Sequence, residues 1–311
     1  MIYHEDSEAE KDSRRKKMRI LNFGSLNLDY VYCVDHFVKP GETLAALSRT
    51  VKAGGKGLNQ SVALARAGVQ VCHAGCLGAG GEMLKTLLEE NGVDTTFLLP
   101  VRAMQGHTVI QVSAEGENSI LLYGGSNRCV PEEYVRKVIG QFEQGDWLVL
   151  QNEISQLPRI VELAGEKRMH IVLNPSPYDR QMEGLDFSKL DWLLVNEIEA
   201  EQISAEKEPE RVWNKLHEKY PGLSVLMTLG SRGSVAYRVS GNGVETTWAK
   251  AVRVKAVDTT AAGDTYTGYF IAGLTEGKAL SECMGDAARA AAVTVTRPGA
   301  AESIPWRREL A

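Results

Sequence analysis

The sequence VDTTAAGDTYTG, residues 257–268, is followed by the apolar stretch YFIAGL and predicts a loop of small residues that opens into a helix. Without bulky side chains at Ala261, Ala262 and Gly263, successive backbone N–H groups can face an anion, and the helix dipole favours negative charge there. Asp264 follows directly. A carboxylate beside an anion pocket is suited to take a proton from an attacking hydroxyl. An acidic residue in the first turn of a helix is also common for local reasons, so this stretch alone leaves both interpretations open.

Short apolar segments alternate with amphipathic segments along most of the remaining chain. The apolar segments are typical of strands in a parallel sheet that is covered on both faces. They comprise residues 19–23, 69–74, 147–150, 171–173, 193–195 and 225–229. The segments with helical periodicity comprise residues 58–67, 82–90, 132–142 and 211–219. This alternation predicts a doubly wound, mainly parallel α/β fold, with ligands at the carboxyl ends of the strands.

Two stretches break this alternation: residues 30–51 and 97–123 are β-rich and lack helical periodicity. The second contains TVIQVSA, the turn-like EGEN and then SILLY, which is the pattern of a β-hairpin. We expect both stretches to form a small β-sheet lid inserted into a single α/β domain, residues 18–311, because no linker composition separates the parts. Residues 1–17 carry charges of both signs without an apolar run, which predicts a flexible tail.

The composition narrows the class of protein. The chain has 311 residues, is 43% hydrophobic and carries a formal net charge of −5. This charge disfavours a nucleic-acid partner, since phosphate backbones bind clustered Lys and Arg. No apolar run approaches the roughly 18 residues of a membrane helix, and no secretory signal is recognisable. We therefore expect a cytosolic protein that binds neither nucleic acid nor membrane.

The cysteines do not suggest a disulfide framework, because there are five in a chain of this length. Cys72, His73 and Cys76 stand close together in VQVCHAGC and could be interpreted as metal ligands. However, the segment alternates like a strand and lacks a second ligand pair, so buried structural thiols are expected instead.

Polar residues in two segments are suited to binding a polyol. In AGGKGLNQSVALARAG, residues 53–68, glycines let backbone approach a ligand, and Lys56 and Asn59 could bond to hydroxyls. In FGSLNLDYVY, Asn27 and Asp29 alternate with apolar residues and would share one face of a strand. Taken singly, a glycine-rich turn and a solvent-facing strand edge explain these two patterns equally well.

Two further segments carry polar groups at predicted strand ends. WLLVNEIEAE ends a buried strand in Asn196 and Glu199, whose oxygens could hold Mg²⁺ through water or could simply cap a helix. VLMTLGSRGS ends a strand at Thr228, and Gly230 and Gly233 then predict a turn that could admit the phosphates or ribose of a nucleotide.

In this order, the five segments resemble the ribokinase-like (phosphofructokinase-B) family of carbohydrate kinases over residues 19–306. The most specific sign is the pairing of GGKGLNQ with DTTAAGDT, and EGENSILLYGGSN and VTRPGAAESIPW add to it. The resemblance implies transfer of a phosphoryl group from ATP to a sugar hydroxyl, with D-ribose as the expected acceptor. Fructokinase, deoxyribokinase and nucleoside or pseudouridine kinase activities stay open. So does a sugar-binding regulator without catalysis, which would have no use for the base Asp264.

The resemblance also implies roles for individual residues. Asp264 would be the general base, with Ala261, Ala262 and Gly263 as the anion hole. The sugar would be bound by Asn27, Asp29, Gly55, Lys56, Asn59 and Glu153, together with Asp264. The nucleotide would be bound by Asn196, Thr228, Gly230 and Gly233, and Mg²⁺ would be held through water by Asn196 and Glu199. A monovalent cation, preferably K⁺, would be held by Asp258, Thr260, Thr294, Arg297, Gly299 and Ser303.

The predicted lid has two features of its own. Its residues 105–108, with the sequence QGHT, depart from the pattern usual in the family at positions where lid side chains touch the sugar. An apolar stripe is also predicted, because Ile110, Val112, Ile120 and Leu122 alternate with other residues along two strands. Pairing two lids across a two-fold axis would cover both stripes, so we expect a homodimer joined through the lid.

Overall fold

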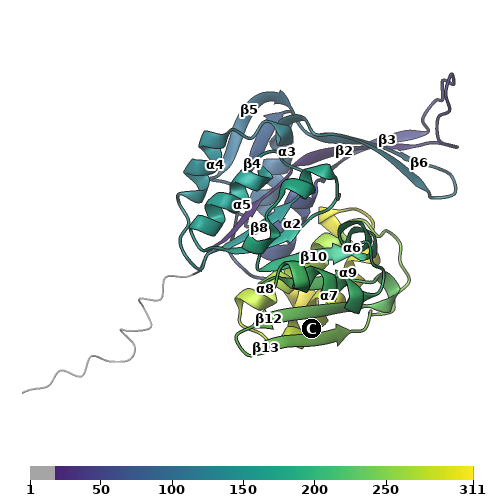
Figure 1. Cartoon of the computed structure of the whole chain (residues 1–311). Coiled ribbons are helices and arrows are strands. Elements are labelled where there is room, and N and C mark those ends of the chain that lie inside the picture. Colours follow the sequence, from purple (N-terminus) through teal and green to yellow (C-terminus); the bar gives the residue numbers. More distant parts are fainter. Residues whose placement is uncertain (1–17, 311) are drawn as a thin grey trace, which may run out of the picture.

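The computed structural model describes residues 18–310, and Figure 1 shows a large α/β body from which a narrow sheet projects. The predicted flexible tail, residues 1–17, lies outside the described residues.

The body is built on a nine-stranded sheet in the order β13-β12-β11-β10-β9-β8-β1-β4-β5. Neighbours from β11 to β5 pair in parallel, while β12 and β13 are antiparallel additions at one edge. The strands are β1 (Ile20–Phe23), β4 (Val71–Ala79), β5 (Leu98–Met104), β8 (Trp147–Gln151), β9 (His170–Asn174), β10 (Trp192–Asn196), β11 (Ser224–Thr228), β12 (Ser234–Ser240) and β13 (Gly243–Ala249). The prediction of a doubly wound, mainly parallel α/β fold is confirmed.

Helices cover both faces of this sheet. The helices on one face are α2 (Lys56–Arg66), α3 (Glu82–Glu90), α8 (Ala262–Thr275) and α9 (Leu280–Val295). The opposite face is covered by α4 (Glu132–Ile139), α5 (Leu157–Glu166) and α7 (Pro209–Lys219), while α6 (Glu197–Ser204) follows β10 directly. All the predicted strands and helices are present, with ends that differ by a few residues.

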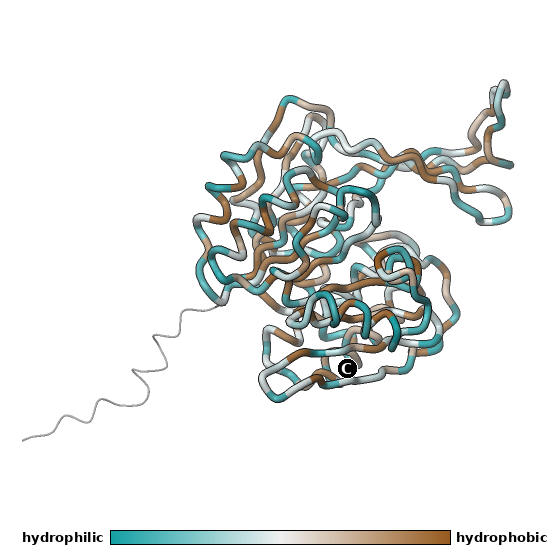
Figure 2. Tube along the Cα trace, viewed as in Figure 1, coloured by the Kyte–Doolittle hydropathy of each residue, from teal (hydrophilic) through white to brown (hydrophobic). Residues whose placement is uncertain are grey.

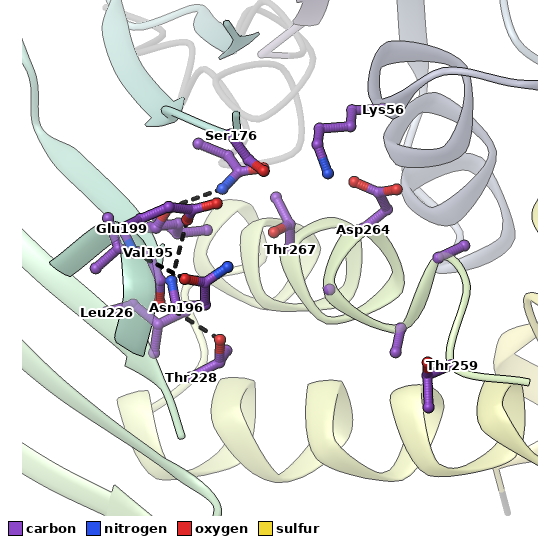
Figure 3. Close-up of a pocket in the computed structure, with 15 residues that line it drawn as sticks. Lys56, Ser176, Val195, Asn196, Glu199, Leu226, Thr228, Thr259, Asp264 and Thr267 are labelled. Atoms are coloured by element: carbon purple, nitrogen blue, oxygen red, sulfur yellow. Dashed lines mark hydrogen bonds between the residues drawn. The ribbon is translucent and has the colours of Figure 1, made fainter. Parts of the chain in front are cut away.

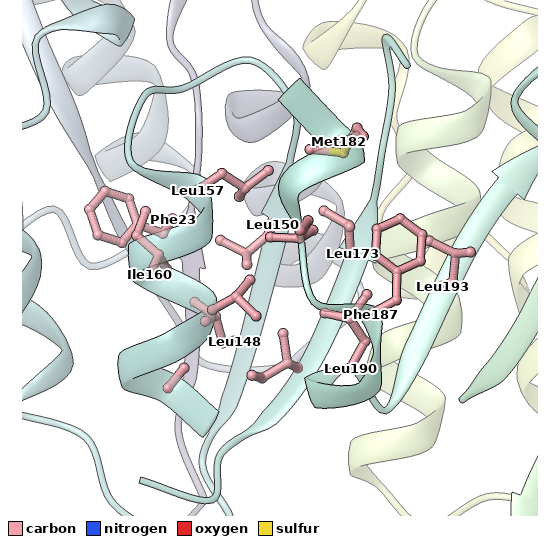
Figure 4. Packing of buried hydrophobic residues seen from close by; sticks show 14 of the residues in the cluster. Phe23, Leu148, Leu150, Leu157, Ile160, Leu173, Met182, Phe187, Leu190 and Leu193 are labelled. Carbon is pink, nitrogen blue, oxygen red and sulfur yellow. The ribbon is translucent and has the colours of Figure 1, made fainter. Parts of the chain in front are cut away.

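Alternation along the strands assigns side chains to the two helical layers. Leu148 and Leu150 of β8 pack in the same cluster as Leu157 and Ile160 of α5, as Figure 4 shows. Trp147 and Val149 pack on the α2 and α8 side. The same alternation carries the last residues of four neighbouring strands towards α2 and α8, and these residues are polar. They are Gln151, Asn174, Asn196 and Thr228. The carboxyl end of the sheet therefore presents a polar row beneath the start of α8.

The projecting sheet has four strands in the order β3-β2-β6-β7, and we call it the lid. Its strands are β2 (Asn27–Cys33), β3 (Ser48–Gly54), β6 (His107–Val112) and β7 (Asn118–Tyr123). One expected boundary is wrong: β5, within the predicted lid segment 97–123, belongs to the body. It pairs in parallel with β4 after the α3 crossover and so completes a βαβ unit. Figure 2 shows apolar residues running along the lid strands.

Two further expectations concern membranes and metals. Within residues 18–310, no helix is long and apolar enough to cross a bilayer. All five cysteines are free, and Cys76 and Cys283 are buried. Among the described residues, no three acidic, His or Cys side chains are grouped so that they could hold a metal ion.

Candidate active site

The start of α8 directs backbone N–H groups into a cavity at the carboxyl end of the sheet. Ala261 precedes the helix in the left-handed conformation, with φ of 58°, and its carbonyl accepts the N–H of Thr265 at 2.8 Å. In the described structure, no backbone carbonyl accepts the N–H groups of Gly263 and Asp264, as is usual in a first helical turn. Ala261, Ala262 and Gly263 line the cavity, so this turn has the geometry of an anion hole.

Asp264 lies buried at the edge of this cavity and is held by two amides from α2. Asn59 Nδ2 donates to its Oδ2, and Gln60 Nε2 donates to its Oδ1, both at 2.9 Å. Lys56, at the start of α2, points towards Asp264 in Figure 3. Burial lowers the pKa of the Lys56 ammonium, but the carboxylates of Asp264, Glu153 and Glu199 outweigh this effect and raise it. A charged ammonium and a hydrogen-bonded carboxylate thus face one another.

Glycines allow α2 to approach both β1 and α8 closely. A Cβ on Gly57 would lie 2.3 Å from the backbone nitrogen of Ser25, and one on Gly268 would lie 2.4 Å from Cβ of Ala63. Any side chain at these positions would force the helices or the strand apart. The close packing places the first turn of α2 beside the first turn of α8.

The sugar-side residues predicted from the sequence gather around the first turn of α2. Glu153, which follows β8, accepts the backbone N–H of Lys56 at 3.0 Å and the hydroxyl of Ser25. Ser25 in turn accepts the N–H of Gly57 at 3.2 Å. Gly55 has φ of 94°, and a Cβ there would lie 3.0 Å from the backbone nitrogen of Asn27. One carboxylate therefore fixes the glycine-rich turn against the end of β1.

Asn27 and Asp29 stand at the root of the lid. Asp29 Oδ1 accepts the hydroxyl of Thr108 at 2.6 Å, and Asn27 Oδ1 accepts Asn127 Nδ2 at 2.8 Å. Burial raises the pKa of Asp29 to about 6, and the nearby Glu153 acts in the same direction. Among the described residues, Asp29 Oδ2 and Asn27 Nδ2 have no hydrogen-bond partner, so both atoms are available for a ligand hydroxyl.

Several residues that build this site were given no role of their own by sequence reasoning, although Thr108 belongs to the QGHT segment that was expected near the sugar. Ser25, Thr108 and Asn127 each hold a predicted sugar-side residue, and Gln60 holds Asp264. Gln60 and Asn127 stand within motifs that carried the resemblance, but only the fold shows which atoms they meet. Gln105, expected near the sugar as part of QGHT, is buried instead. It accepts the N–H of Gly78 at 2.8 Å and donates to the carbonyl of Leu26 at 2.5 Å, which ties the lid root to the body.

The cavity extends from Asp264 to the ends of β10 and β11, where Asn196, Glu199 and Thr228 line it (Figure 3). Asn196 and Glu199 form a reciprocal capping box at the start of α6. Asn196 Oδ1 accepts the N–H of Glu199 at 2.9 Å, and Glu199 Oε2 accepts the N–H of Asn196 at 3.1 Å. Asn196 is therefore left with an NH₂ group to donate, and Glu199 is left with one carboxylate oxygen.

The two glycines predicted for the nucleotide have a different position. Gly230 and Gly233 form the turn between β11 and β12 and do not line the cavity. A Cβ on Gly233 would lie 2.1 Å from the carbonyl oxygen of Ala249, so this glycine is required by close packing against the end of β13. The turn requires both glycines, and their predicted contact with the nucleotide stays a prediction.

The six positions predicted for a monovalent cation lie on two segments that one carboxylate links. Asp258 accepts the N–H of Thr260 at 2.9 Å and the N–H of Gly299 at 3.0 Å. Ser303 donates to the carbonyl of Ala300 at 2.7 Å. The other two are bound elsewhere: the Thr294 hydroxyl bonds to Thr265 and the Arg297 guanidinium to Glu309.

The sequence matches a known family of kinases. The model of the pfkB family of carbohydrate kinases matches residues 17–307. The chain belongs to this family. It is 37% identical over 306 residues to the ribokinase of Haemophilus influenzae, covering 95% of this chain and 97% of the relative. It is 33% identical over 291 residues to the ribokinase of Bacillus subtilis, covering 92% and 96%.

Solved structures of the pfkB fold agree with this assignment. Ribokinase from Cryptococcus neoformans in complex with ADP superposes with a TM-score of 0.81 at 33% identity, covering 94% of this chain and 98% of that chain. Arabidopsis thaliana ribokinase complexed with ribose and ATP superposes with a TM-score of 0.80 at 27% identity, covering 95% and 98%. This pfkB protein is thus a phosphotransferase that acts on a sugar.

Proposed function

We propose that this pfkB kinase transfers the γ-phosphoryl group of ATP to the 5-hydroxyl of D-ribose, with Asp264 as the general base. The observation that carries the proposal is the position of Asp264. It stands where the sugar-side residues around the first turn of α2 meet the cavity that reaches Asn196 and Thr228. The names of the similar proteins support ribose as the acceptor.

The reaction is an in-line displacement at the γ-phosphorus. Asp264 removes the proton from the ribose hydroxyl as its oxygen forms a bond to phosphorus. The bond from phosphorus to the β–γ bridging oxygen breaks, and its electron pair leaves with ADP. The N–H groups of Gly263 and Asp264 stabilise the charge on the transferring group, and Lys56 adds a positive charge from α2.

The sugar is oriented by groups with fixed hydrogen-bond roles. Asp29 and Glu153 accept from hydroxyls, while Asn27 has Nδ2 left to donate, because its oxygen is bound to Asn127. Asn59 Oδ1 is buried and has no partner among the described side chains, so it can accept a further hydroxyl. This set of acceptors and donors suits a polyol with several adjacent hydroxyls.

Mg²⁺ would reach the site with ATP. The residues present fit an ion held through water. Glu199 has one carboxylate oxygen without a partner among residues 18–310, and Asp264 is the only other acidic side chain of that part of the chain that lines the cavity. When bound, the ion would neutralise charge on the phosphates. Asn196 presents its NH₂ group and would donate to a phosphate oxygen or to a metal-bound water.

A monovalent cation, preferably K⁺, would be held by Asp258, Thr260, Thr294, Arg297, Gly299 and Ser303, chiefly through carbonyl oxygens. The donors fit a hard cation, since they are carboxylate, hydroxyl and carbonyl oxygens. When bound, the cation would stiffen the two segments that adjoin Ala261. Asp258 already links those segments through Thr260 and Gly299.

Two copies of the chain would pair through their lids. The strand β7 is exposed along its whole length, and Ile120 and Leu122 are 57% and 42% exposed. Ile110 of β6 stands directly opposite Ile120 and extends the same apolar face. An exposed apolar face on two edge strands promotes aggregation unless a partner covers it, which supports a homodimer.

The proposed compartment is the cytosol. All five cysteines are free, and the exposed Cys33 and Cys129 would be vulnerable to pairing in an oxidising compartment. The proposed donor, ATP, also belongs to that compartment.

An ADP-release assay over pentoses, hexoses and nucleosides tests the proposed function. Ribose should give the highest kcat/KM of the panel, and phosphorus NMR of the product should show a phosphate ester on O5. A clear preference for fructose, deoxyribose or a nucleoside would overturn ribose as the acceptor while leaving phosphoryl transfer intact.

A further inference from the structure

A continuous chain of buried polar side chains runs between α2 and the sheet and ends on Asp264. Gln151 Nε2 donates to Asn22 Oδ1 at 2.9 Å and to Gln60 Oε1 at 2.7 Å. Asn22 Nδ2 donates to Ser61 Oγ at 2.8 Å, and Ser61 Oγ bonds to His73 Nδ1 at 2.8 Å. Asn22, Gln60, Ser61, His73 and Gln151 are fully buried. The sugar and nucleotide roles described above account for none of them.

Three acceptors that cannot donate fix the direction of every bond in this chain. Asn22 Nδ2 also donates to the carbonyl of Gly57 at 2.7 Å, so its Oδ1 must face Gln151. Asn174 Nδ2 donates to the carbonyl of Leu194 at 2.9 Å, so its Oδ1 must face Gln60, 3.2 Å away. Ionised Asp264 can only accept. Gln60 Oε1 accepts from Gln151 and Gln60 Nε2 donates to Asn174, so the NH₂ group must be the end that faces Asp264.

The bond between Ser61 and His73, at the end of the chain away from Asp264, agrees with these donor and acceptor assignments. Ser61 accepts from Asn22 and so donates to His73 Nδ1, which requires a neutral imidazole. Burial lowers the pKa of His73 to about 4, so the ring stays neutral over the working range of the enzyme. His73 therefore does not gain a proton near neutral pH that would reverse its bond to Ser61.

We propose that Gln60 is a positioning residue for phosphoryl transfer, whose amide, held by Gln151 and Asn174, orients the Asp264 carboxylate and favours its ionised form. This proposal rests on the proposed role of Asp264 as the base. Asn59 supplies the second hydrogen bond but also has an oxygen free for the sugar, whereas all three polar contacts of Gln60 are within the protein. Gln60 therefore acts on the base without touching substrate.

The charges that face Asp264 set the background for a test by pH. Lys56 of α2 favours the carboxylate, while Glu153 and Glu199 act on Lys56 from the ends of β8 and β10. Replacing Gln60 leaves these charges in place and removes one hydrogen bond to the ionised form. The carboxylate should then ionise at higher pH, because a hydrogen bond to the charged form stabilises it.

Three variants separate positioning from packing. Gln60→Met keeps the length of the side chain but cannot donate. Gln60→Glu keeps the shape of the side chain and places a second carboxyl group beside Asp264. The two carboxyl groups would share one proton, which would be lost only at higher pH than in the wild-type protein. Ser61→Ala is the matched control, because it removes two buried hydrogen bonds of the same chain from the same helix without touching Asp264.

The measurements are the pH dependence of kcat/KM for the sugar and the carboxyl ¹³C titration of Asp264, assigned by its loss in Asp264→Asn. We expect kcat to fall roughly 10- to 100-fold in Gln60→Met, the range for losing a hydrogen bond to a charged group. In Gln60→Met, the acidic limb of the kcat/KM profile and the midpoint of the ¹³C titration should both move up by about one pH unit. Both should move further in Gln60→Glu. Ser61→Ala should lower thermal stability and leave both values unchanged.

The outcomes distinguish the two proposals. An unchanged ¹³C midpoint in Gln60→Met and Gln60→Glu overturns the role of Gln60, whether or not the protein is an active kinase. Equal shifts in Ser61→Ala also overturn it, because the effect would then come from general loosening of the chain. Full activity of Asp264→Asn contradicts the proposed base instead, and leaves the measured effect of Gln60 on the carboxylate standing.

Discussion

Asn59 and Asp264, which are 205 positions apart in the sequence, lie 2.9 Å apart between Nδ2 and Oδ2. The contact joins the first turn of α2 to the first turn of α8, so the sugar side and the phosphate side of the site share one wall. The glycines at the α2–α8 contact make this possible, since the helices pack closely only where a side chain is missing.

The base itself can be tested by Asp264→Asn. We expect kcat to fall by roughly 10²-fold or more, because the amide cannot accept the proton of the sugar hydroxyl. Ribose affinity should change less than kcat. Thermal stability should fall, because the new NH₂ group faces one of the two amides that donate to the carboxylate. Steady-state kinetics with calorimetric titration of ribose measures kcat and ribose affinity, and a kcat near the wild-type value would contradict the assignment.

Removal of the Asp29 carboxylate should separate the two substrates. Asp29→Ala should weaken ribose binding by roughly 10-fold or more while leaving ATP affinity nearly unchanged, because a buried hydroxyl acceptor is lost on the sugar side only. Separate calorimetric titrations of ribose and ATP decide this. Equal weakening of both would indicate damage to the fold.

Asp29 should also make stability depend on pH. Its pKa is raised to about 6 in the folded protein from an ordinary value of 3.8, so folding favours the protonated form. The stability that this provides is present below pH 3.8 and is lost as pH rises to about 6. Asp29→Asn, which cannot ionise, should therefore raise the melting temperature at pH 8 more than at pH 5. Equal changes at both values would show that the burial of the charge has no energetic effect.

The contact between α2 and α8 can be tested by adding one methyl group. In Gly268→Ala the new Cβ would meet Cβ of Ala63 at 2.4 Å, so we expect a loss of about 1–3 kcal/mol in the free energy of unfolding and lower kcat. Gly285→Ala in α9 is the control, because the nearest atom is Arg289 Nη1 at 3.7 Å. That variant should be about 0.5–1 kcal/mol more stable. Denaturant unfolding and steady-state kinetics measure both.

The cation proposal predicts a dependence on the salt used. Activity should rise when Na⁺ is replaced by K⁺ at constant ionic strength, and Asp258→Ala should abolish this difference. The variant loses the carboxylate that links Thr260 to Gly299. An equal rate in both salts for the wild-type protein would remove the cation site and leave phosphoryl transfer unaffected.

The lid predicts the oligomeric state. The wild-type protein should be a dimer in light scattering at micromolar concentration, whereas Ile110→Asp combined with Leu122→Asp should give a monomer with poor sugar affinity. Leu121→Asp is the control, because Leu121 is 71% exposed on the opposite face of the same strand. A wild-type monomer with full activity would show that the lid does not need a second lid for catalysis.

The sequence by itself determined the fold class, because burial of apolar strands and the periodicity of helices are local patterns that leave a direct trace in residue order. It also located the turn before Asp264, since a run of residues with small side chains is visible in the sequence. The tertiary structure decided what those patterns could not contain. It assigned β5 to the body, because pairing with β4 depends on the α3 crossover. It added a packing requirement at Gly233, because the carbonyl of Ala249 lies against it. It also gave Gln60 three partners from distant segments, and hydrogen bonds between residues far apart in sequence have no signature in the order of the residues.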